Sequence, residues 1–401
     1  MHMYPISITN TSSFSVGPDC QREFDFGSSR SLQIQSSIQK LATFPYKSGV
    51  MARRNWGNDR HSICSFASKM KPSLAATLVS LFSSEDATVL DPFAGCGTVP
   101  FEASLQGRKS IATDVSPLAT ILTSAKVRPP ERAEVFSVLE VLKWNIESFW
   151  QKSNLADMES EIRDFYHERT AAEILVARSC LRELSDNFQE NDAALFLSAC
   201  LVHLLHGNRP YALSRRSHNI IPIPPKGPRK YKPVIEALRE KAFRMLASSM
   251  PPDFRPGDVF CCSADKLPLA NSVVDVIITS PPFLGTTHFL RQNRIRLWFV
   301  GWDYQTQALR RQEFVEHDGR PERFAPILRE LHRVLHPNAL MIWHVGIVKD
   351  KNMADILAPL FLQAGFTEKG RLWEDARSLE THGRTDRGST HTHGFVVLQK
   401  N

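Results

Sequence analysis

The chain has 401 residues, of which 42% are hydrophobic and 23% are charged. These values are typical of a folded globular protein and exclude a disordered or fibrous chain. There is no apolar run of about 18 residues, and the first residues lack the pattern of a secretory signal, so we expect neither a membrane span nor secretion. The formal net charge of +7 is compatible with a polyanionic partner.

The seven cysteines form no C-x-x-C pair, which predicts neither a zinc cluster nor a disulfide framework. A reducing cytoplasm is therefore the expected location. Three histidines, His382, His391 and His393, lie in one hydrophilic stretch near the end of the chain. Because no carboxylate or cysteine stands at a spacing typical of ligands, we expect no metal site there.

Residues 1–40 are rich in Ser, Thr, Gln and Asn and have little apolar periodicity, which predicts a loosely ordered N-terminal arm. Residues 41–126 are the predicted first part of an α/β domain. Pro72 is placed to open a helix over residues 73–79.

A βαβ unit is predicted over residues 88–114. A short strand at 88–90 leads into a glycine-containing turn at 91–98, and a helix through 101–105 follows. A second strand at 110–113 then ends at Asp114. Strand, glycine turn, helix, strand and acid in this order are typical of the unit that binds nucleoside cofactors.

Four residues of this unit have predicted binding roles. Gly95 and Gly97 let the backbone approach a ligand closely, and the N-terminus of the following helix adds partial positive charge. Asp114 stands where it could accept hydrogen bonds from a ribose diol, and Asp91 could hold a cationic amino group. The agreement of strand, helix and acid makes this motif more specific than an isolated G-x-G.

Residues 127–255 interrupt the α/β alternation and are predicted to be a helical insert, with helices over 131–152, 170–184 and 193–205. The loop that follows, at 207–233, is basic, interrupted by prolines, and contains Tyr211 and Tyr231. Such a segment could clamp a phosphate backbone, or it could be a solvated basic loop. The residues of this loop that we predict to contact nucleic acid are Arg215, Arg216, Arg229 and Lys230.

The α/β pattern resumes over residues 256–401. A β-branched run at 273–278 predicts a buried strand that brings Ser280 to its carboxyl end, where open α/β sheets place their chemistry. Pro281 and Pro282 stiffen the turn and have no N–H, so the turn offers hydrogen-bond acceptors beside the flat ring of Phe283. This arrangement suits the exocyclic amino group of a planar base. The simpler interpretation is a strand end with a Pro-Pro turn and a core phenylalanine.

Further elements on both sides of this strand complete the pattern. Before it, a strand at 257–260 ends near Ser263 and Asp265. After it come an aromatic and basic stretch at 289–302, a helix at 324–335 and a buried strand at 340–345. A helix at 353–364 and strands at 367–373 and 394–398 follow. In the stretch at 289–302, Arg291 and Arg294 are additional candidates for contact with nucleic acid.

The turn at 91–98 and the tetrapeptide Ser280-Pro281-Pro282-Phe283 together resemble the S-adenosylmethionine-dependent amino-methyltransferases that modify cytosine N4 or adenine N6 in DNA. The resemblance covers residues 44–126 and 257–400. It implies a Rossmann-like class I methyltransferase sheet with the helical insert between the second and third strands. It also implies that residues 61–72 line the methionine end of S-adenosyl-L-methionine. The cofactor-binding residues that it implies are Asp91, Phe93, Gly95, Gly97, Thr98, Asp114, Ser263 and Asp265.

The same resemblance implies the chemistry. The catalytic residues would be Ser280, Pro281, Pro282 and Phe283. The amine of a base flipped out of double-stranded DNA would attack the methyl group in line, held by Ser280 and stacked on Phe283. A serine at the first position is more typical of the cytosine-N4 branch than of the adenine-N6 branch. A cognate restriction endonuclease is a candidate partner, and the protein is expected to be a monomer or a dimer.

Two departures from the family pattern affect these expectations. Ser263 stands where the family often has an acid, so Asp265 is an alternative partner for adenine. The insert also lies between the second and third strands, so the family's usual assignment of a target-recognition region applies only loosely to this chain. An RNA methyltransferase acting on guanine N2 and a non-catalytic nucleic-acid-binding module are the competing interpretations. The intact motif glycines and Ser280 argue against the second.

Overall fold

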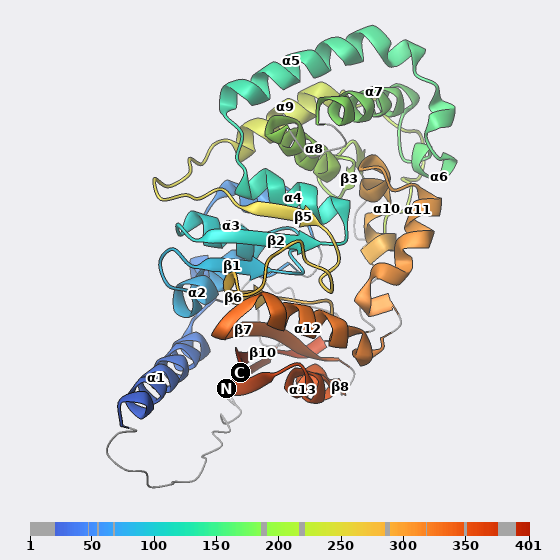
Figure 1. Ribbon diagram of the computed structural model, residues 1–401. Coiled ribbons are helices and arrows are strands. Elements are labelled where there is room, and N and C mark those ends of the chain that lie inside the picture. Colours follow the sequence, from blue (N-terminus) through green and yellow to red (C-terminus); the bar gives the residue numbers. More distant parts are fainter. Residues whose placement is uncertain are drawn as a thin grey trace.

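The computed structural model describes residues 21–46, 48–53, 56–66, 69–185, 191–215, 221–284, 289–317, 319–348, 351–375 and 390–401. A mostly parallel sheet forms the centre of the molecule (Figure 1). The strand order is β5-β2-β1-β6-β7-β10-β9, and β8 pairs with β7 outside this path. The strands are β1 (Thr88–Asp91), β2 (Lys109–Asp114), β5 (Asp258–Cys261), β6 (Val274–Thr279), β7 (Leu335–Val348), β8 (Lys351–Asn352), β9 (Phe366–Asp375) and β10 (Thr390–Lys400).

The strand order reverses between β1 and β6. From β1 the chain moves outward to β2 and β5, and it then returns to β6 on the other side of β1. These five parallel strands, including β7, are followed by β10, which is antiparallel to both of its neighbours. In open α/β sheets, ligands bind at the carboxyl ends of the strands where the order reverses. The predicted Rossmann-like methyltransferase sheet is thus confirmed, and its switch point lies between the two sequence motifs.

Helices cover both faces of the sheet because successive side chains of a strand point to opposite sides. In β6, Val276 and Ile278 pack with α1 (Gln21–Thr43), α2 (Pro72–Phe82) and α3 (Thr98–Leu105). Ile277 points to the other face, toward α12 (Phe324–Val334) and α13 (Met353–Gln363). The buried positions of α12 recur with helical spacing, as expected of a helix with one apolar stripe. They are Phe324, Ile327, Leu328, Leu331 and Val334.

The predicted helical insert is confirmed between β2 and β5. α4 (Pro117–Val127) follows β2, and the insert helices form a separate cluster beyond β5 (Figure 1). The apolar helix α8 (Asp192–Leu204) is buried at the centre of this cluster, as its sequence predicts. The other helices of this part are α5 (Arg132–Phe149), α6 (Ser160–Arg163), α7 (Glu168–Leu184) and α9 (Val234–Met245), with the short strands β3 (His206–Gly207) and β4 (Ser214–Arg215). α10 (Phe289–Phe299) and α11 (Tyr304–Arg310) lie at the side toward which the central strands point (Figure 1).

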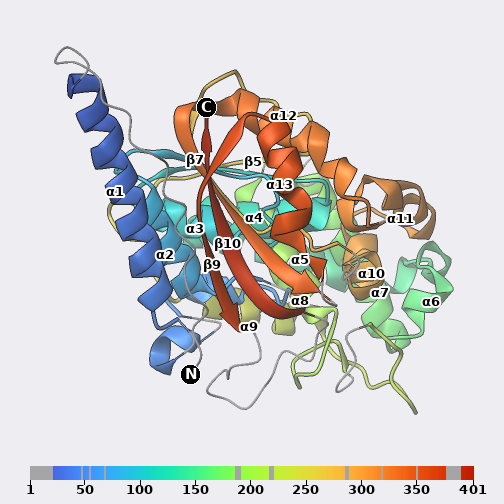
Figure 2. The ribbon, with the colours of Figure 1, turned by 90° about the horizontal axis from the view of Figure 1, so that it is seen from below.

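The prediction of a loosely ordered arm over residues 1–40 is wrong for its second half. α1 begins at Gln21 and runs alongside α2 and β9 (Figure 2). Ile34, Ile38 and Leu41 are buried in the core that α1 shares with the sheet. Gln35 donates from Nε2 to the carbonyl of Lys369 in β9, at 3.0 Å. α1 therefore covers the sheet rather than extending from it. Residues 1–20 lie outside the described part of the chain.

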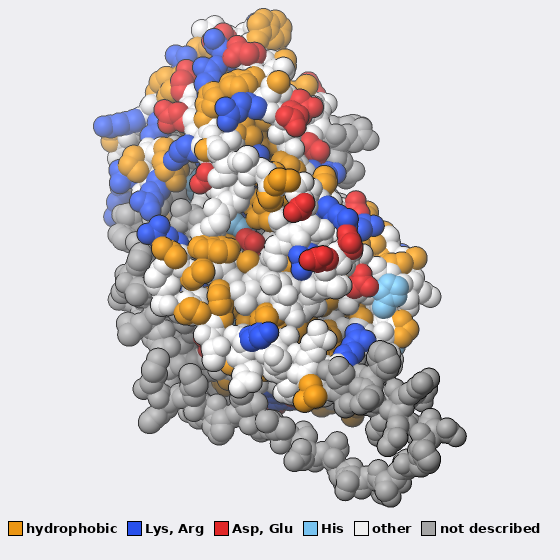
Figure 3. Space-filling view, turned by 90° about the vertical axis from the view of Figure 1, so that its left-hand side faces the viewer, with side chains coloured by type: hydrophobic (Ala, Val, Ile, Leu, Met, Phe, Trp, Pro, Cys, Tyr) orange, Lys and Arg blue, Asp and Glu red, His pale blue; other side chains and the backbone are white. Residues whose placement is uncertain are grey.

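Figure 3 shows the side of the molecule at the amino ends of the parallel strands. On the described part of this side, Lys and Arg side chains are intermixed with Asp and Glu. In the segments that precede β5 and β1, the guanidinium of Arg255 lies 2.5 Å from the carboxylate of Asp86. Among the described residues, no helix is both long enough and apolar enough to cross a membrane.

Candidate active site

The two sequence motifs meet at the carboxyl edge of the sheet. Asp91 is the last residue of β1, and Thr279 is the last residue of the neighbouring strand β6. The two strands are in parallel register, with Leu90 opposite Ile277. The Thr279 hydroxyl donates to Asp91 Oδ1 at 2.7 Å, and both side chains are buried. The turn at 91–98 and the Ser280 tetrapeptide therefore follow two adjacent strands whose last residues are hydrogen-bonded to each other.

The glycine turn has the geometry that its residues predict. Gly97 caps α3 with a φ of 70°, a conformation that glycine adopts without steric cost. A Cβ at Gly97 would lie 2.7 Å from the Oγ1 of Thr123 in α4, so a larger residue would also separate two packed helices. The backbone N–H of Phe93 donates to Asp91 Oδ1 at 3.1 Å, which closes the start of the turn.

Asp114 at the end of β2 is tied to the same turn. It accepts a hydrogen bond from the backbone N–H of Gly95 at 3.0 Å and another from Ser116 at 2.9 Å. Burial raises the pKa of Asp114 to about 6, although both backbone hydrogen bonds act in the opposite direction. Burial likewise raises the pKa of Asp91 to about 7, against the hydrogen bonds from Thr279 and Phe93. A cationic or multiply hydrogen-bonding ligand would stabilise both carboxylates, so this pair fits the amino and ribose groups of a nucleoside cofactor.

The other predicted cofactor residues surround this pair. Ser263 and Asp265 follow β5, whose last residue pairs with Asp114 in the sheet, and Asp265 is exposed. Phe93 packs edge-on against the ring of Trp343 in β7, with the ring centres 6.1 Å apart. Thr98 is buried at the first position of α3. All eight predicted residues thus lie at or beside one edge of the sheet.

The Ser280 tetrapeptide lies against the middle of the sheet. Ser280 is half-buried, and its Oγ lies 2.8 Å from Nδ1 of His344 on β7. Pro281 is buried, and Pro282 is half-buried. The ring of Phe283 lies 5.4 Å from the ring of His344, measured between centroids. One side of Phe283 is therefore occupied by the protein.

The predicted nucleic-acid residues have mixed environments. Arg215, Lys230 and Arg291 are exposed, and the structure places Arg291 on α10, beyond the tetrapeptide. Arg229 is exposed, but its Nε donates to the carbonyl of Asp164 at 2.8 Å. Arg294 is half-buried, with its guanidinium 5.6 Å from the ring centre of Phe165. Arg216 lies outside the described residues.

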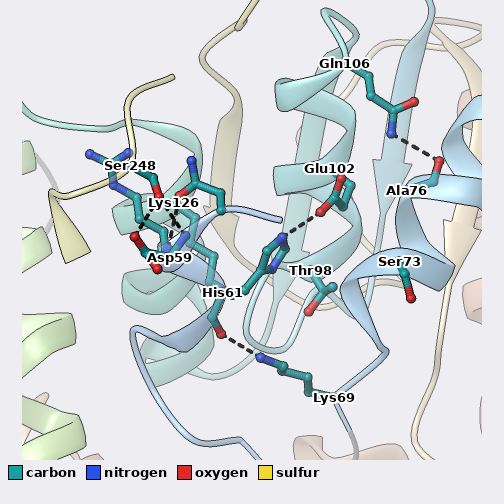
Figure 4. A network of polar contacts seen from close by, with 12 residues as sticks. Asp59, His61, Lys69, Ser73, Ala76, Thr98, Glu102, Gln106, Lys126 and Ser248 are labelled. Atoms are coloured by element: carbon teal, nitrogen blue, oxygen red, sulfur yellow. Dashed lines mark hydrogen bonds and ion pairs between the residues drawn. The ribbon is translucent and has the colours of Figure 1, made fainter. Parts of the chain in front are cut away.

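Two polar features were not predicted from the sequence. The first is His344. The sequence feature that could have indicated it is a histidine inside an otherwise apolar strand. The second is a buried network beneath the glycine turn (Figure 4). His61 Nε2 lies 2.6 Å from Glu102 Oε1, and both side chains are buried. The buried Lys126 donates to the carbonyl of Cys96 within the turn. The sequence features that could have indicated this network are Glu102 and Lys126, two ionisable residues within apolar helices.

Burial dominates the electrostatics of this network. It raises the pKa of Glu102 to about 8, while the charge of Lys126 acts in the opposite direction. Burial also lowers the pKa of His61 well below its ordinary range, and Lys126 and Lys69 lower it further. The His61–Glu102 contact is therefore an uncharged hydrogen bond at neutral pH. It connects the segment at 59–62 to α3, close to the glycine turn.

The strand order is that of the Rossmann-like class I methyltransferase fold. Residues 46–120 match the N6/N4 methyltransferase family described as DNA methylase. The chain is also 23% identical over 246 residues to the type II methyltransferase M.MvaI of Kocuria varians, across 54% of this chain and 52% of that protein. These two matches support an amino-methyltransferase of the N6/N4 DNA family with S-adenosylmethionine as its cofactor. The chain spans about half the length of this curated relative.

Solved structures with a similar outline include an S-adenosylmethionine-dependent methyltransferase of Methanosarcina mazei. It has a TM-score of 0.35 and 10% identity, over 80% of this chain and 96% of that chain. An rRNA methyltransferase, aviRa, of Streptomyces viridochromogenes gives a TM-score of 0.31 and 14% identity, over 82% of this chain and 85% of that chain. Because these scores are low, the fold assignment rests on strand order alone.

Proposed function

We propose that the protein transfers a methyl group from S-adenosylmethionine to the exocyclic amine of a base flipped out of double-stranded DNA. The observation that carries this proposal is the hydrogen bond between Thr279 and Asp91. It joins the start of a cofactor-type turn to the last residue of the strand that leads into Ser280. A methyl donor bound at the turn and a methyl acceptor bound at Ser280 would lie at neighbouring strand ends, as a direct transfer requires. The family match at residues 46–120 supports DNA as the substrate.

The residues at the edge fit the groups of this cofactor. Asp91 would face the cationic amino group, Asp114 the ribose hydroxyls, and Ser263 or Asp265 the adenine. The bound cofactor would supply an electrophilic methyl group. The protein would orient the amine, exclude water and accept hydrogen bonds from the nitrogen through the Ser280 hydroxyl and the Pro281 carbonyl as positive charge develops.

We further propose cytosine N4 as the target, because Ser280 opens the tetrapeptide. Phe283 would support the flipped base. The helical insert and the exposed residues Arg215, Lys230 and Arg291 would contact the DNA backbone. Since the relative M.MvaI is a type II methyltransferase, a cognate restriction endonuclease remains the candidate partner.

The test uses the full chain with labelled S-adenosylmethionine and either duplex DNA or RNA, followed by mass spectrometry of the released nucleosides. We expect label in DNA as N4-methylcytosine. Asp114→Ala should bind the cofactor much more weakly, and Ser280→Ala should bind it almost normally but transfer slowly. N6-methyladenine would overturn the base assignment alone, and label confined to RNA would overturn the DNA substrate.

A further inference from the structure

Two histidines, a phenylalanine and a glutamate lie near Ser280 on one face of the sheet. In the register of β7, β10 and β9, His344 lies opposite Phe395, and His393 lies opposite Glu374. His393 and Phe395 are two residues apart, so the four side chains project from the same face. The rings of His344 and His393 are stacked, with 5.4 Å between centroids and 14° between planes. His344 is the member of this group that contacts Ser280.

The protonation state of His344 determines whether its ring can accept a hydrogen bond. Burial and the neighbouring His393 lower the pKa of His344 to about 3. Its imidazole is therefore neutral at physiological pH, with one nitrogen carrying a proton and the other an accepting lone pair. If Nδ1 is the acceptor, the hydroxyl of Ser280 is its donor at 2.8 Å. The lone pairs of the serine oxygen then remain available to another donor.

We infer that His344 is a positioning residue that holds the Ser280 hydroxyl as a donor to Nδ1, so that the serine oxygen accepts from the attacking amine. This inference rests on the proposed methyl transfer. A protonated Nδ1 would instead occupy a lone pair of Ser280 and turn the serine proton toward the amine. The orientation of one half-buried imidazole thus decides whether the first residue of the tetrapeptide attracts or repels the N–H of the base.

The hydrogen bond between Ser280 and His344 also provides a path for the proton that the amine releases. The lone pair of the amine nitrogen forms a bond to the methyl carbon, and the sulfur–methyl bond breaks with its electron pair left on sulfur. The nitrogen becomes cationic and loses one N–H proton to the Ser280 oxygen, while the serine proton moves to His344 Nδ1. From the imidazolium the proton passes to water. A weakly basic imidazole is sufficient, because an amine cation conjugated to the ring is strongly acidic.

Two substitutions separate this role from simple packing. His344→Asn places an oxygen acceptor near the position of Nδ1, whereas His344→Phe fills the space without an acceptor. We expect His344→Phe to lower the single-turnover rate of DNA methylation by about tenfold to a hundredfold, with cofactor affinity nearly unchanged, and His344→Asn to restore most of the rate. In a Ser280→Ala background, His344→Phe should cost nothing further. His336→Asn, at the exposed amino end of the same strand, is the matched control.

A second measurement does not depend on activity. Nitrogen NMR of the His344 ring should show an unprotonated Nδ1 in the wild type, and its resonance should move in Ser280→Ala. The groups that face His344 and titrate nearby are His393 and, beside it, Glu374, whose pKa burial raises to about 7. The spectra should therefore be compared over that range.

The outcomes distinguish the two claims. A wild-type protein that methylates neither DNA nor RNA would overturn the proposed function, and the NMR result would still decide the Ser280–His344 bond. A protonated Nδ1, or equal losses from His344→Phe with and without the Ser280 hydroxyl, would overturn the positioning role.

Discussion

The hydroxyl of Thr279 lies 2.7 Å from Oδ1 of Asp91, although the two residues are 188 positions apart in the chain. Asp91 Oδ1 also accepts from the backbone N–H of Phe93, so this one oxygen orders both the strand end and the turn. The other oxygen of Asp91 can then serve a ligand. This arrangement explains why the carboxyl group can be buried at the carboxyl edge of the sheet without losing its hydrogen bonds.

Cofactor affinity should depend on pH through Asp91. A bound ammonium favours the carboxylate, so binding below the free-protein pKa of about 7 releases a proton. The dissociation constant should therefore fall as pH rises toward 7, by up to about tenfold per pH unit, and then level off. Asp114, with a pKa of about 6, adds to the slope at lower pH. Calorimetry across this range measures the effect.

Asp91→Asn is the control for that prediction. It keeps an oxygen that can accept from Thr279 and Phe93 but cannot ionise. We expect weaker binding with a flatter pH dependence near neutrality. An unchanged slope in Asp91→Asn would show that another group faces the ammonium.

The fold was predictable because its signals are local. The β-branched run before Thr279, the glycines of the turn and Asp114 are short-range patterns, and they specify strand, turn and strand end. The partnership of Ser280 with His344 was not predictable, because it depends on β7 joining β6 in one particular register. The buried face of α1 was predictable in principle. Ile34, Ile38 and Leu41 have helical spacing, but the polar residues between them obscured it.

The pair of His61 and Glu102 should give stability a pH dependence. In the unfolded chain the Glu102 carboxyl has its ordinary pKa of 4.5, whereas the folded protein holds its proton up to about pH 8. Between these values folding takes up a proton, so the contribution of Glu102 to the free energy of unfolding declines as pH rises. Glu102→Gln keeps an uncharged partner for His61 and removes this decline. Relative to the wild type, the variant should gain stability between about pH 6 and pH 8.

Chemical denaturation at the two pH values tests this expectation, with Glu102→Ala as the variant that lacks any partner for His61. Glu102→Ala should be less stable than Glu102→Gln at both pH values, because the buried imidazole of His61 loses its hydrogen bond. A constant difference between wild type and Glu102→Gln would mean that the carboxyl is ionised throughout.

The basic loop should contribute to DNA affinity without setting sequence preference. Arg215→Gln and Lys230→Gln remove exposed charges, so both should weaken binding to all duplexes alike and make the salt dependence shallower. Arg229→Gln is the comparison, because its guanidinium donates to two carbonyls, those of Asp164 and Gly227, whereas that of Arg215 donates to one, that of Asn208. We expect it to change the salt slope less. Binding isotherms at several salt concentrations measure all three, and an altered sequence preference at constant slope would indicate contacts to bases.

The final prediction concerns Gly346, which makes room for Phe283. A Cβ at Gly346 would lie 2.5 Å from Cε2 of the Phe283 ring and 2.9 Å from Cδ2, closer than carbon atoms can pack. Gly346→Ala should therefore displace the ring or shift β7, and overpacking of this kind costs about 1–3 kcal/mol. A displaced ring would also support a flipped base poorly, so DNA methylation should fall while cofactor affinity is kept.

Removal of the ring identifies the cause. In a Phe283→Ala background the added methyl group finds space, so Gly346→Ala should destabilise the protein much less than it does in the wild type. The free energy of unfolding of the four proteins completes this cycle, and methylation rates are measured in parallel. Once Phe283 is absent, Gly346→Ala should not slow methylation further. Equal destabilisation in both backgrounds would show that the methyl group clashes with the strand itself, and the link between Gly346 and the tetrapeptide would be lost.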